Sequence, residues 1–204
     1  ILDRVNGIVD RLARSAPDRT ELQRTRKVML DEIGTTLRTQ GATAEALARY
    51  REGLRIGEEL AARDPDSADR RRDLSVSHIN IGNVLQDQGQ LAEALAEFRK
   101  DLAIAEALAA KDPANTFLQR DLAVSYEKVG DALREDGDKT GALGSFRKSI
   151  GIRETLLARN KSDRLAQRDL SVSHEKIGNI LADQNDLTGA LVETALVVTT
   201  HAGQ

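Results

Sequence analysis

Apolar and polar residues follow a helical period along this chain. Leu74, Ile81 and Leu85 have the spacing i, i+7 and i+11, which places them on one face of a helix. Gly89 interrupts the pattern, and a second apolar series then runs over residues 91–108. Because glycine favours the turn just past a helix C-terminus, the pattern predicts two consecutive helices joined at Gly89.

The same pattern returns at a fixed interval of 48 residues. The stretch RDLSVSHINIGNVLQDQ at 72–88 reappears in similar form at 120–136 and 168–184, and a weaker copy lies at 24–40. Internal similarity at such a period is typical of a solenoid. We expect one domain over residues 1–204. Its parts would be a partial repeat at 1–16, full repeats at 17–64, 65–112 and 113–160, and a repeat with a shortened second helix at 161–204.

Turn and capping residues recur in register with the helices. The position after each first helix holds glycine or asparagine, the residues that best tolerate a left-handed backbone. They are Gly41, Gly89, Gly137 and Asn185. Residues suited to cap the next first helix are Ser67, Asn115 and Asp163. These signals predict where each hairpin turns and where its successor begins.

Composition narrows the classes of partner. The chain has 30 basic and 33 acidic residues and a formal charge of −3, so it lacks the basic excess typical of nucleic-acid binding. No apolar run approaches the roughly 20 residues that span a bilayer. The first residues lack the layout of a signal peptide. We therefore expect a cytoplasmic protein with no nucleic-acid or membrane partner. Because it begins at Ile1, we also expect it to be part of a longer chain.

Small residues recur at two fixed positions in every hairpin. The first helices carry Gly34, Gly82, Gly130 and Gly178, and the second helices carry Ala46, Ala94, Ala142 and Ala190. Four residues after the alanine come Tyr50, Phe98, Phe146 and Thr194. This combination resembles the tetratricopeptide repeat family, in a long variant like that of bacterial multi-repeat signalling proteins. The resemblance implies an all-α, right-handed solenoid of antiparallel helix hairpins.

The small residues have a physical reason apart from the resemblance. Without bulk where two helices cross, their backbones can approach closely, so we expect Gly82 and Ala94 to meet at the crossing. The repeat is 48 residues long, whereas the family repeat is about 34. We expect the additional residues to lengthen both helices, giving a first helix of about 22 residues, rather than to form a third helix.

The resemblance also implies a binding surface, because in this family the first helix of each hairpin lines a concave groove. Carried onto this sequence, the groove positions are Asp31, Thr35 and Arg38; Ile79, Asn83 and Gln86; Glu127, Asp131 and Arg134; and Glu175 and Asn179. Asparagine can hold a peptide backbone through paired amide hydrogen bonds. The alternative is a solvated helix face with local ion pairs.

An arginine recurs eleven residues before the Asn83 position, close to three helical turns, and so on nearly the same face. The arginines are Arg24, Arg72, Arg120 and Arg168. They could anchor carboxylates or phosphates of a partner. They could instead pair with Asp73, Asp121 and Asp169 of the neighbouring repeat. Strict repetition favours the second role, because every repeat shares it.

Candidate catalytic residues are few. His78 and His174 lie on the apolar stripe at the position of Leu30 and Tyr126, which predicts core packing. The chain has no cysteine, and no metal, nucleotide or nucleophile motif is complete. We expect a non-enzymatic protein-interaction scaffold without cofactors, binding a peptide or helix in its groove. The alternatives are a sensor or regulatory arm of a larger bacterial signalling protein, or a module that self-associates through its terminal repeats.

Overall fold

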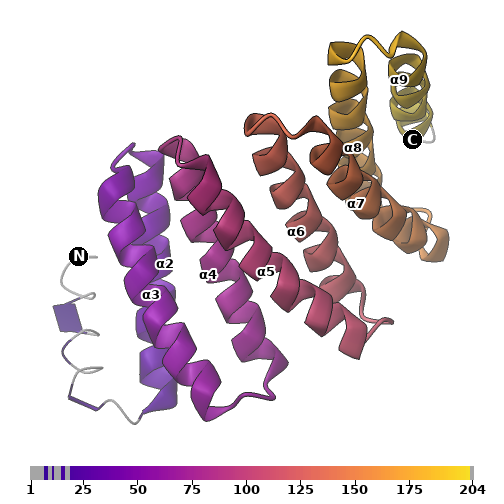
Figure 1. The fold of residues 1–204 in the computed structure, drawn as a ribbon. Coiled ribbons are helices and arrows are strands. Elements are labelled where there is room, and N and C mark those ends of the chain that lie inside the picture. Colours follow the sequence, from indigo (N-terminus) through magenta and orange to yellow (C-terminus); the bar gives the residue numbers. More distant parts are fainter. Residues whose placement is uncertain (1–6, 9–10, 12–14, 17–18, 203–204) are drawn as a thin grey trace. The chain divides into compact units, whose positions relative to one another are not determined.

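The computed structural model describes residues 7, 8, 11, 15, 16 and 19–202, with side chains up to residue 197. The described residues contain helices and turns but no strand, which confirms the all-α prediction (Figure 1). The helices are α2 (Thr20–Thr39), α3 (Thr43–Arg63), α4 (Ala68–Asp87), α5 (Leu91–Lys111), α6 (Thr116–Glu135), α7 (Lys139–Arg159), α8 (Arg164–Asp183) and α9 (Leu187–Ala202). The partial repeat predicted at 1–16 lies mostly outside the described residues.

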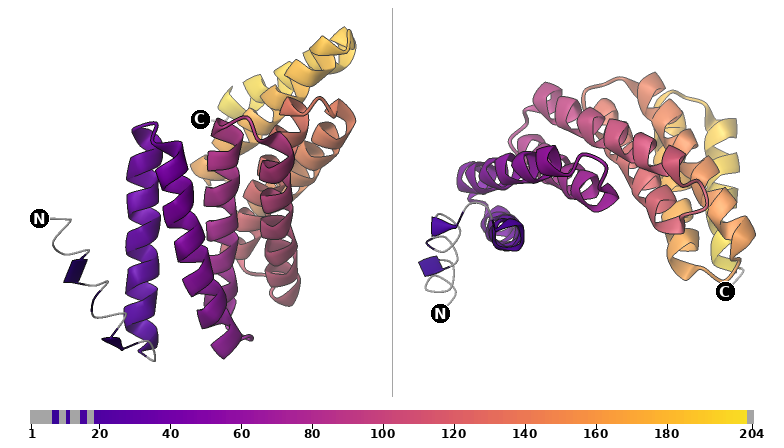
Figure 2. Two further views of the ribbon diagram at one scale, coloured as in Figure 1. Left: turned by 60° about the vertical axis from the view of Figure 1, so that its left-hand side comes forward. Right: turned by 90° about the horizontal axis from the view of Figure 1, so that it is seen from below.

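Successive helices pair into hairpins that pack on one another, as the solenoid prediction requires. The chain forms two compact units, residues 1–104 and 105–204, and the boundary falls within α5. In the first unit α2 packs on α3 and α3 on α4; in the second, α6 packs on α7, α7 on α8 and α8 on α9. Both views of Figure 2 show α2 and α3 side by side. The pairs α2–α3, α4–α5, α6–α7 and α8–α9 are called hairpins 1 to 4. That all four form one domain stays a prediction.

Helix lengths agree with the expected use of the longer repeat. The first helices have 20 residues and α3, α5 and α7 have 21, with no third helix per repeat within residues 19–202. The last helix, α9, has 16 residues and ends at Ala202. It is shorter than α3, α5 and α7, in line with the shortened second helix expected for this repeat. It still includes Thr199 and Thr200, because threonine lowers helix propensity only by a few tenths of a kcal/mol per residue, about 0.7 at most.

The predicted turn chemistry is confirmed at every hairpin. Gly41, Gly89, Gly137 and Asn185 all have positive φ, from 61° to 89°. Side-chain oxygens of Ser67, Asn115 and Asp163 accept hydrogen bonds from backbone N–H groups in the first turns of α4, α6 and α8. These local signals fix where each helix begins and ends. Equivalent residues therefore occupy the same place in the helices of every hairpin.

At the helix crossings, the glycine of the first helix has a contact that was not predicted from the sequence. A Cβ added to Gly82 would lie 2.6 Å from the Phe98 ring, and one on Gly130 would lie 2.7 Å from the Phe146 ring. The glycine therefore makes room for a buried aromatic ring, one turn beyond the alanine. At Gly178, where Thr194 replaces the aromatic residue, the nearest atoms instead include the carbonyl oxygen of the hairpin's alanine, at 3.7 Å.

Candidate functional site

The groove positions predicted from the sequence lie along one stripe of each first helix. In α4 the stripe consists of Arg72, Val76, Ile79, Asn83 and Gln86, whose offsets of 4, 3, 4 and 3 residues keep them on one face. None of these side chains is fully buried. We call this set, with its equivalents in α2, α6 and α8, the first-helix stripe.

Exposure varies among the predicted site residues. Thr35, Arg72, Arg134, Arg168, Glu175 and Asn179 are exposed. Asp31, Arg38, Ile79, Asn83, Gln86, Arg120, Glu127 and Asp131 are partly buried.

Sequence reasoning missed the one apolar residue that every stripe shares. Val28, Val76, Val124 and Val172 are equivalent, and they are 51%, 40%, 36% and 38% exposed. An isolated exposed valine needs no explanation. Here the same exposed position is valine in all four hairpins, so each hairpin presents one apolar side chain at an equivalent point of its surface. The signal was visible in the sequence, because valine recurs in all four copies of the repeated stretch.

In hairpin 1, part of the stripe is engaged within the protein. Arg38 donates two hydrogen bonds to Asp87 of α4, at 2.5 and 3.1 Å. This bonding raises the pKa of Arg38 above its ordinary value. The Thr35 hydroxyl lies 2.9 Å from the Tyr50 hydroxyl. Arg38 therefore ties neighbouring first helices together rather than standing free for a partner.

Asp31 takes part in an ion pair that is enclosed by hairpin 1. Lys27, one turn earlier, donates to it at 2.7 Å and is only 3% exposed. Burial raises the pKa of Asp31, although Lys27 acts in the opposite direction. Two glycines of α3 make the space: a Cβ on Gly53 would lie 2.9 Å from Asp31 Oδ1, and one on Gly57 3.1 Å from Lys27 Cε.

Hairpin 2 places its buried charge on the other helix. Asp101 of α5, at the position of Gly53, is fully buried and accepts a hydrogen bond from Ser75 of α4. Ser75 occupies the position of Lys27 in hairpin 1. At the Asp31 position this hairpin carries Ile79, so its stripe is apolar where the other three are acidic.

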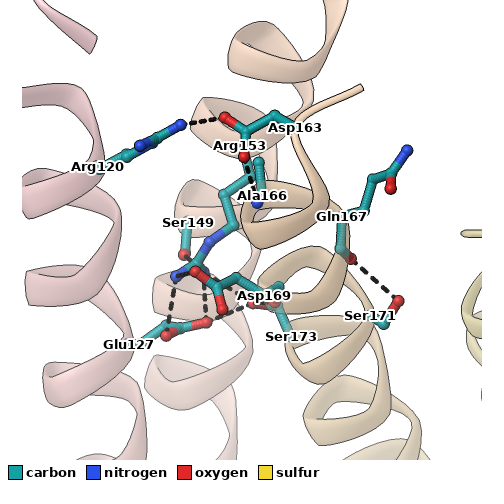
Figure 3. A network of polar contacts seen from close by, with 10 residues as sticks. All are labelled: Arg120, Glu127, Ser149, Arg153, Asp163, Ala166, Gln167, Asp169, Ser171 and Ser173. Carbon is teal, nitrogen blue, oxygen red and sulfur yellow. Dashed lines mark hydrogen bonds and ion pairs between the residues drawn. The ribbon is translucent and has the colours of Figure 1, made fainter. Parts of the chain in front are cut away.

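Hairpin 3 contains a buried polar network that extends to α8 (Figure 3). Arg153 of α7, 4% exposed, donates to both carboxylate oxygens of Glu127 in α6 and to Ser149 of its own helix. It also donates to Ser173 of α8 at 3.1 Å and lies 3.7 Å from Asp169. One guanidinium therefore joins three helices, and Glu127 is committed to it.

The neighbouring stripe residue Asp131 is also paired. It accepts a hydrogen bond from Lys176 of α8 at 2.7 Å, and Arg134 lies 3.8 Å away. The Lys176 ammonium stands 5.3 Å from the centre of the Phe146 ring. Asp131 thus links the first helices of hairpins 3 and 4.

The arginine ladder is present only in part. Arg24 lies 3.6 Å from Asp73 of the next hairpin, as predicted. Arg120 differs: it binds Asp163, the N-cap of α8, while Asp169, its predicted partner, lies near Arg153. Arg168 is exposed and has no ion-pair partner among the described residues. The arginines therefore share a position without sharing one partner type.

His78 and His174 are buried as predicted, but each also has a polar partner. His78 Nδ1 lies 2.7 Å from Glu97, and His174 Nδ1 lies 2.6 Å from Glu193. Burial favours the neutral carboxyl of Glu97, but hydrogen bonds from Lys100 and His78 outweigh it and lower the pKa of Glu97. The signal was present in the sequence: a glutamate follows nineteen residues later in both hairpins that carry histidine. Hairpins 1 and 3 have Arg49 and Ser145 there.

The described residues contain no cluster of three His, Cys, Asp or Glu side chains placed to hold a metal ion. None of the helices formed by these residues is long and apolar enough to cross a membrane.

Comparison with known proteins supports the architecture. The family model of the tetratricopeptide repeat matches residues 28–66 and 79–113. Comparison with curated protein sequences gives no significant match.

Solved structures with the same fold have low sequence identity. BtubC (BKLC) from P. vanneervenii matches with a TM-score of 0.72 and 14% identity, over 100% of this chain and 72% of that one. Apo RapI matches with a TM-score of 0.72 and 14% identity, over all of this chain and 50% of its own length. A Podosopora anserina kinesin light chain protein with nearly identical TPR-like repeats gives 0.64 and 14%, over 99% and 95%.

Proposed function

Because this chain belongs to the tetratricopeptide repeat family, we propose that it binds a peptide or helix of a partner protein along the first-helix stripe. Repeats of this family generally mediate protein–protein interaction and form non-catalytic scaffolds. The stripe would supply the contacts from α2 and α4 in one unit and from α6 and α8 in the other. No catalytic role is part of this proposal.

The observation that carries the proposal is the contrast between the stripe and the interior. Interior positions keep glycine and alanine in all four hairpins. Stripe positions differ, as in the series Thr35, Asn83, Asp131 and Asn179, while the valine beside them stays constant. A surface with a constant apolar residue and a variable polar neighbour is suited to bind a specific segment, because each hairpin can contact a different residue of that segment.

The stripe is tested by replacing its valines. The partner is captured with the chain, identified by mass spectrometry and titrated by calorimetry. We expect Val76→Ser with Val172→Ser to weaken binding about tenfold, because two apolar contacts of under 1 kcal/mol each are lost. Circular dichroism should show unchanged helicity, since both valines are exposed in the free chain.

The matched control changes exposed residues on second helices. Arg51→Ala with Arg147→Ala alters equivalent exposed positions of α3 and α7 away from the stripe. This double variant should bind with wild-type affinity. Equal affinity of the valine variant and this control would contradict the stripe as the binding surface.

A second candidate function, self-association, is favoured by an exposed apolar face on α9. Leu191 is 71% exposed, whereas Leu47, Leu95 and Leu143 at the same position are 7% to 8% exposed. In hairpins 1 and 3 the second helix packs against the first helix of the next hairpin. The α9 face, which also includes the exposed Leu187, therefore matches a further first helix, and we propose that a second copy of this chain can supply one.

The α9 face is tested by light scattering over a concentration series. The wild-type chain should show an apparent mass that rises with concentration. Leu191→Glu should keep the mass of a single chain throughout, because a carboxylate cannot be buried in an apolar contact without a large cost. A wild-type mass that is constant at every concentration would rule out self-association through this face.

A further inference from the structure

A cavity of about 510 Å³ lies between α6 and α7 in the second unit, apart from the first-helix stripe. Its apolar lining includes Leu122, Ile152 and Leu156. Tyr126 also lines it and is two residues from Val124, so the two side chains point to opposite sides of α6. The volume lies in the range of roughly 300–1,000 Å³ that is usual for ligand sites.

Tyr126 forms one wall of the cavity, and its hydroxyl is bonded to α5 rather than to α7. Its hydroxyl donates to Glu106 of α5 at 2.5 Å. Burial and this hydrogen bond raise the pKa of Tyr126 to about 12, so the phenol stays neutral. In hairpins 2 and 4 the equivalent histidine bonds to a glutamate of its own second helix. In hairpin 3 that glutamate is replaced by Ser145, and Tyr126 bonds to Glu106 of α5 instead.

Gly151 provides the opening on the α7 side. A Cβ at this residue would meet no atom within 4 Å, so no packing contact requires glycine there. Glycine weakens a helix interior. The same position carries Arg55 in hairpin 1 and Ala103 in hairpin 2. The absence of a side chain in this hairpin therefore keeps the cavity accessible.

The charged residues that line the cavity are both cations. Lys148 and Arg159 lie on α7, and neither has an ion-pair partner among the described residues. The Lys148 ammonium stands 5.0 Å from the centre of the Tyr126 ring. Eleven residues separate the two cations, which is about 16 Å along a helix at 1.5 Å per residue. An extended peptide covers that distance in about five residues.

We propose that this cavity binds a short, extended acidic segment of a protein. Two carboxylates about five residues apart would pair with Lys148 and Arg159, and an apolar side chain between them would enter the space beside Ile152 and Gly151. Charge complementarity selects this occupant, because an apolar floor between two unpaired cations fits an acidic segment with an apolar centre. The site is independent of the partner bound along the first-helix stripe.

The test uses the whole chain and a fluorescein-labelled hexapeptide, Asp-Ala-Leu-Leu-Ala-Asp, followed by fluorescence anisotropy. We expect saturable binding that weakens at least tenfold for Lys148→Glu and for Arg159→Glu. Gly151→Gln, which fills the opening with a neutral helix-forming residue, should weaken it to the same extent. A peptide with lysine in place of both aspartates should not bind.

Two matched variants separate the cavity from other surfaces. Lys111→Glu reverses an exposed charge at the last position of α5, equivalent to Arg159, and should leave affinity within twofold of wild type. Asn179→Ala on the first-helix stripe should do the same. The proposal is overturned if the acidic peptide does not bind, if Gly151→Gln binds it as tightly as wild type, or if Lys111→Glu weakens it as much as Arg159→Glu.

Discussion

Arg153→Ala is expected to lower the free energy of unfolding by about 3–5 kcal/mol, because removing one partner of a buried ion pair strands the other charge. Arg153 is 4% exposed, and it donates to both oxygens of Glu127. After the substitution, the Glu127 carboxylate would keep Ser173 but no cation within bonding distance. The loss is measured by urea denaturation followed by circular dichroism.

Hairpin 2 provides the control for this prediction. It carries Ile79 and Ala105 at the positions of Glu127 and Arg153, so these two positions are uncharged there. The double variant Glu127→Ile with Arg153→Ala copies these two residues and should recover most of the lost stability, because it leaves no carboxylate without its cation at these positions. If the double variant is as unstable as Arg153→Ala, the loss does not come from the stranded carboxylate.

Gly130→Ala and Gly144→Ala are expected to change stability in opposite directions, although both lie in hairpin 3. A Cβ on Gly130 would stand 2.7 Å from the ring of Phe146, which is fully buried and cannot move aside. Overpacking costs about 1–3 kcal/mol, and the helix propensity of alanine returns about 1 kcal/mol. At Gly144 a Cβ meets nothing within 4 Å, so alanine should stabilise by about 0.5–1 kcal/mol.

Thermal unfolding of the two single variants measures this difference. Gly178→Ala is a third member of the series, because Thr194 replaces the aromatic ring and the nearest atom would be 3.4 Å away. It should be tolerated better than Gly130→Ala. If all three substitutions change stability equally, a clash with the aromatic ring is not the reason that glycine is required at Gly130.

The fold was predictable because its determinants are local and repeated. Gly89 and its equivalents mark the turns, Ser67 and its equivalents cap the next helices, and the apolar spacing between them has a helical period. Each signal depends on backbone preferences that act within a few residues. The aromatic contact of Gly82 was not predicted, because Phe98 is sixteen residues away and its direction depends on how the helices cross.

The first-helix stripe could be placed from the sequence, but its pairing could not. Asp131 and Arg38 were predicted to face a partner, yet Lys176 and Asp87 bind them within the protein. These partners lie 45 and 49 residues away, close to one repeat, where the sequence indicates a neighbour without showing which side chains reach across. Val76 was not predicted as a site residue because it is apolar, and an apolar residue in a helix is first taken as part of the core.

The buried charges have a consequence for how such an array can change its length. Each buried charge has a bonding partner inside its own hairpin: Lys27 pairs with Asp31, Asp101 accepts a hydrogen bond from Ser75, and Arg153 pairs with Glu127. The contact between Arg38 of hairpin 1 and Asp87 of hairpin 2 is over a third exposed, and such surface pairs contribute little energy, about 0–1 kcal/mol. Duplication or deletion of a 48-residue block in the gene would therefore carry each buried charge together with its own counterpart, so the array could gain or lose hairpins and still fold.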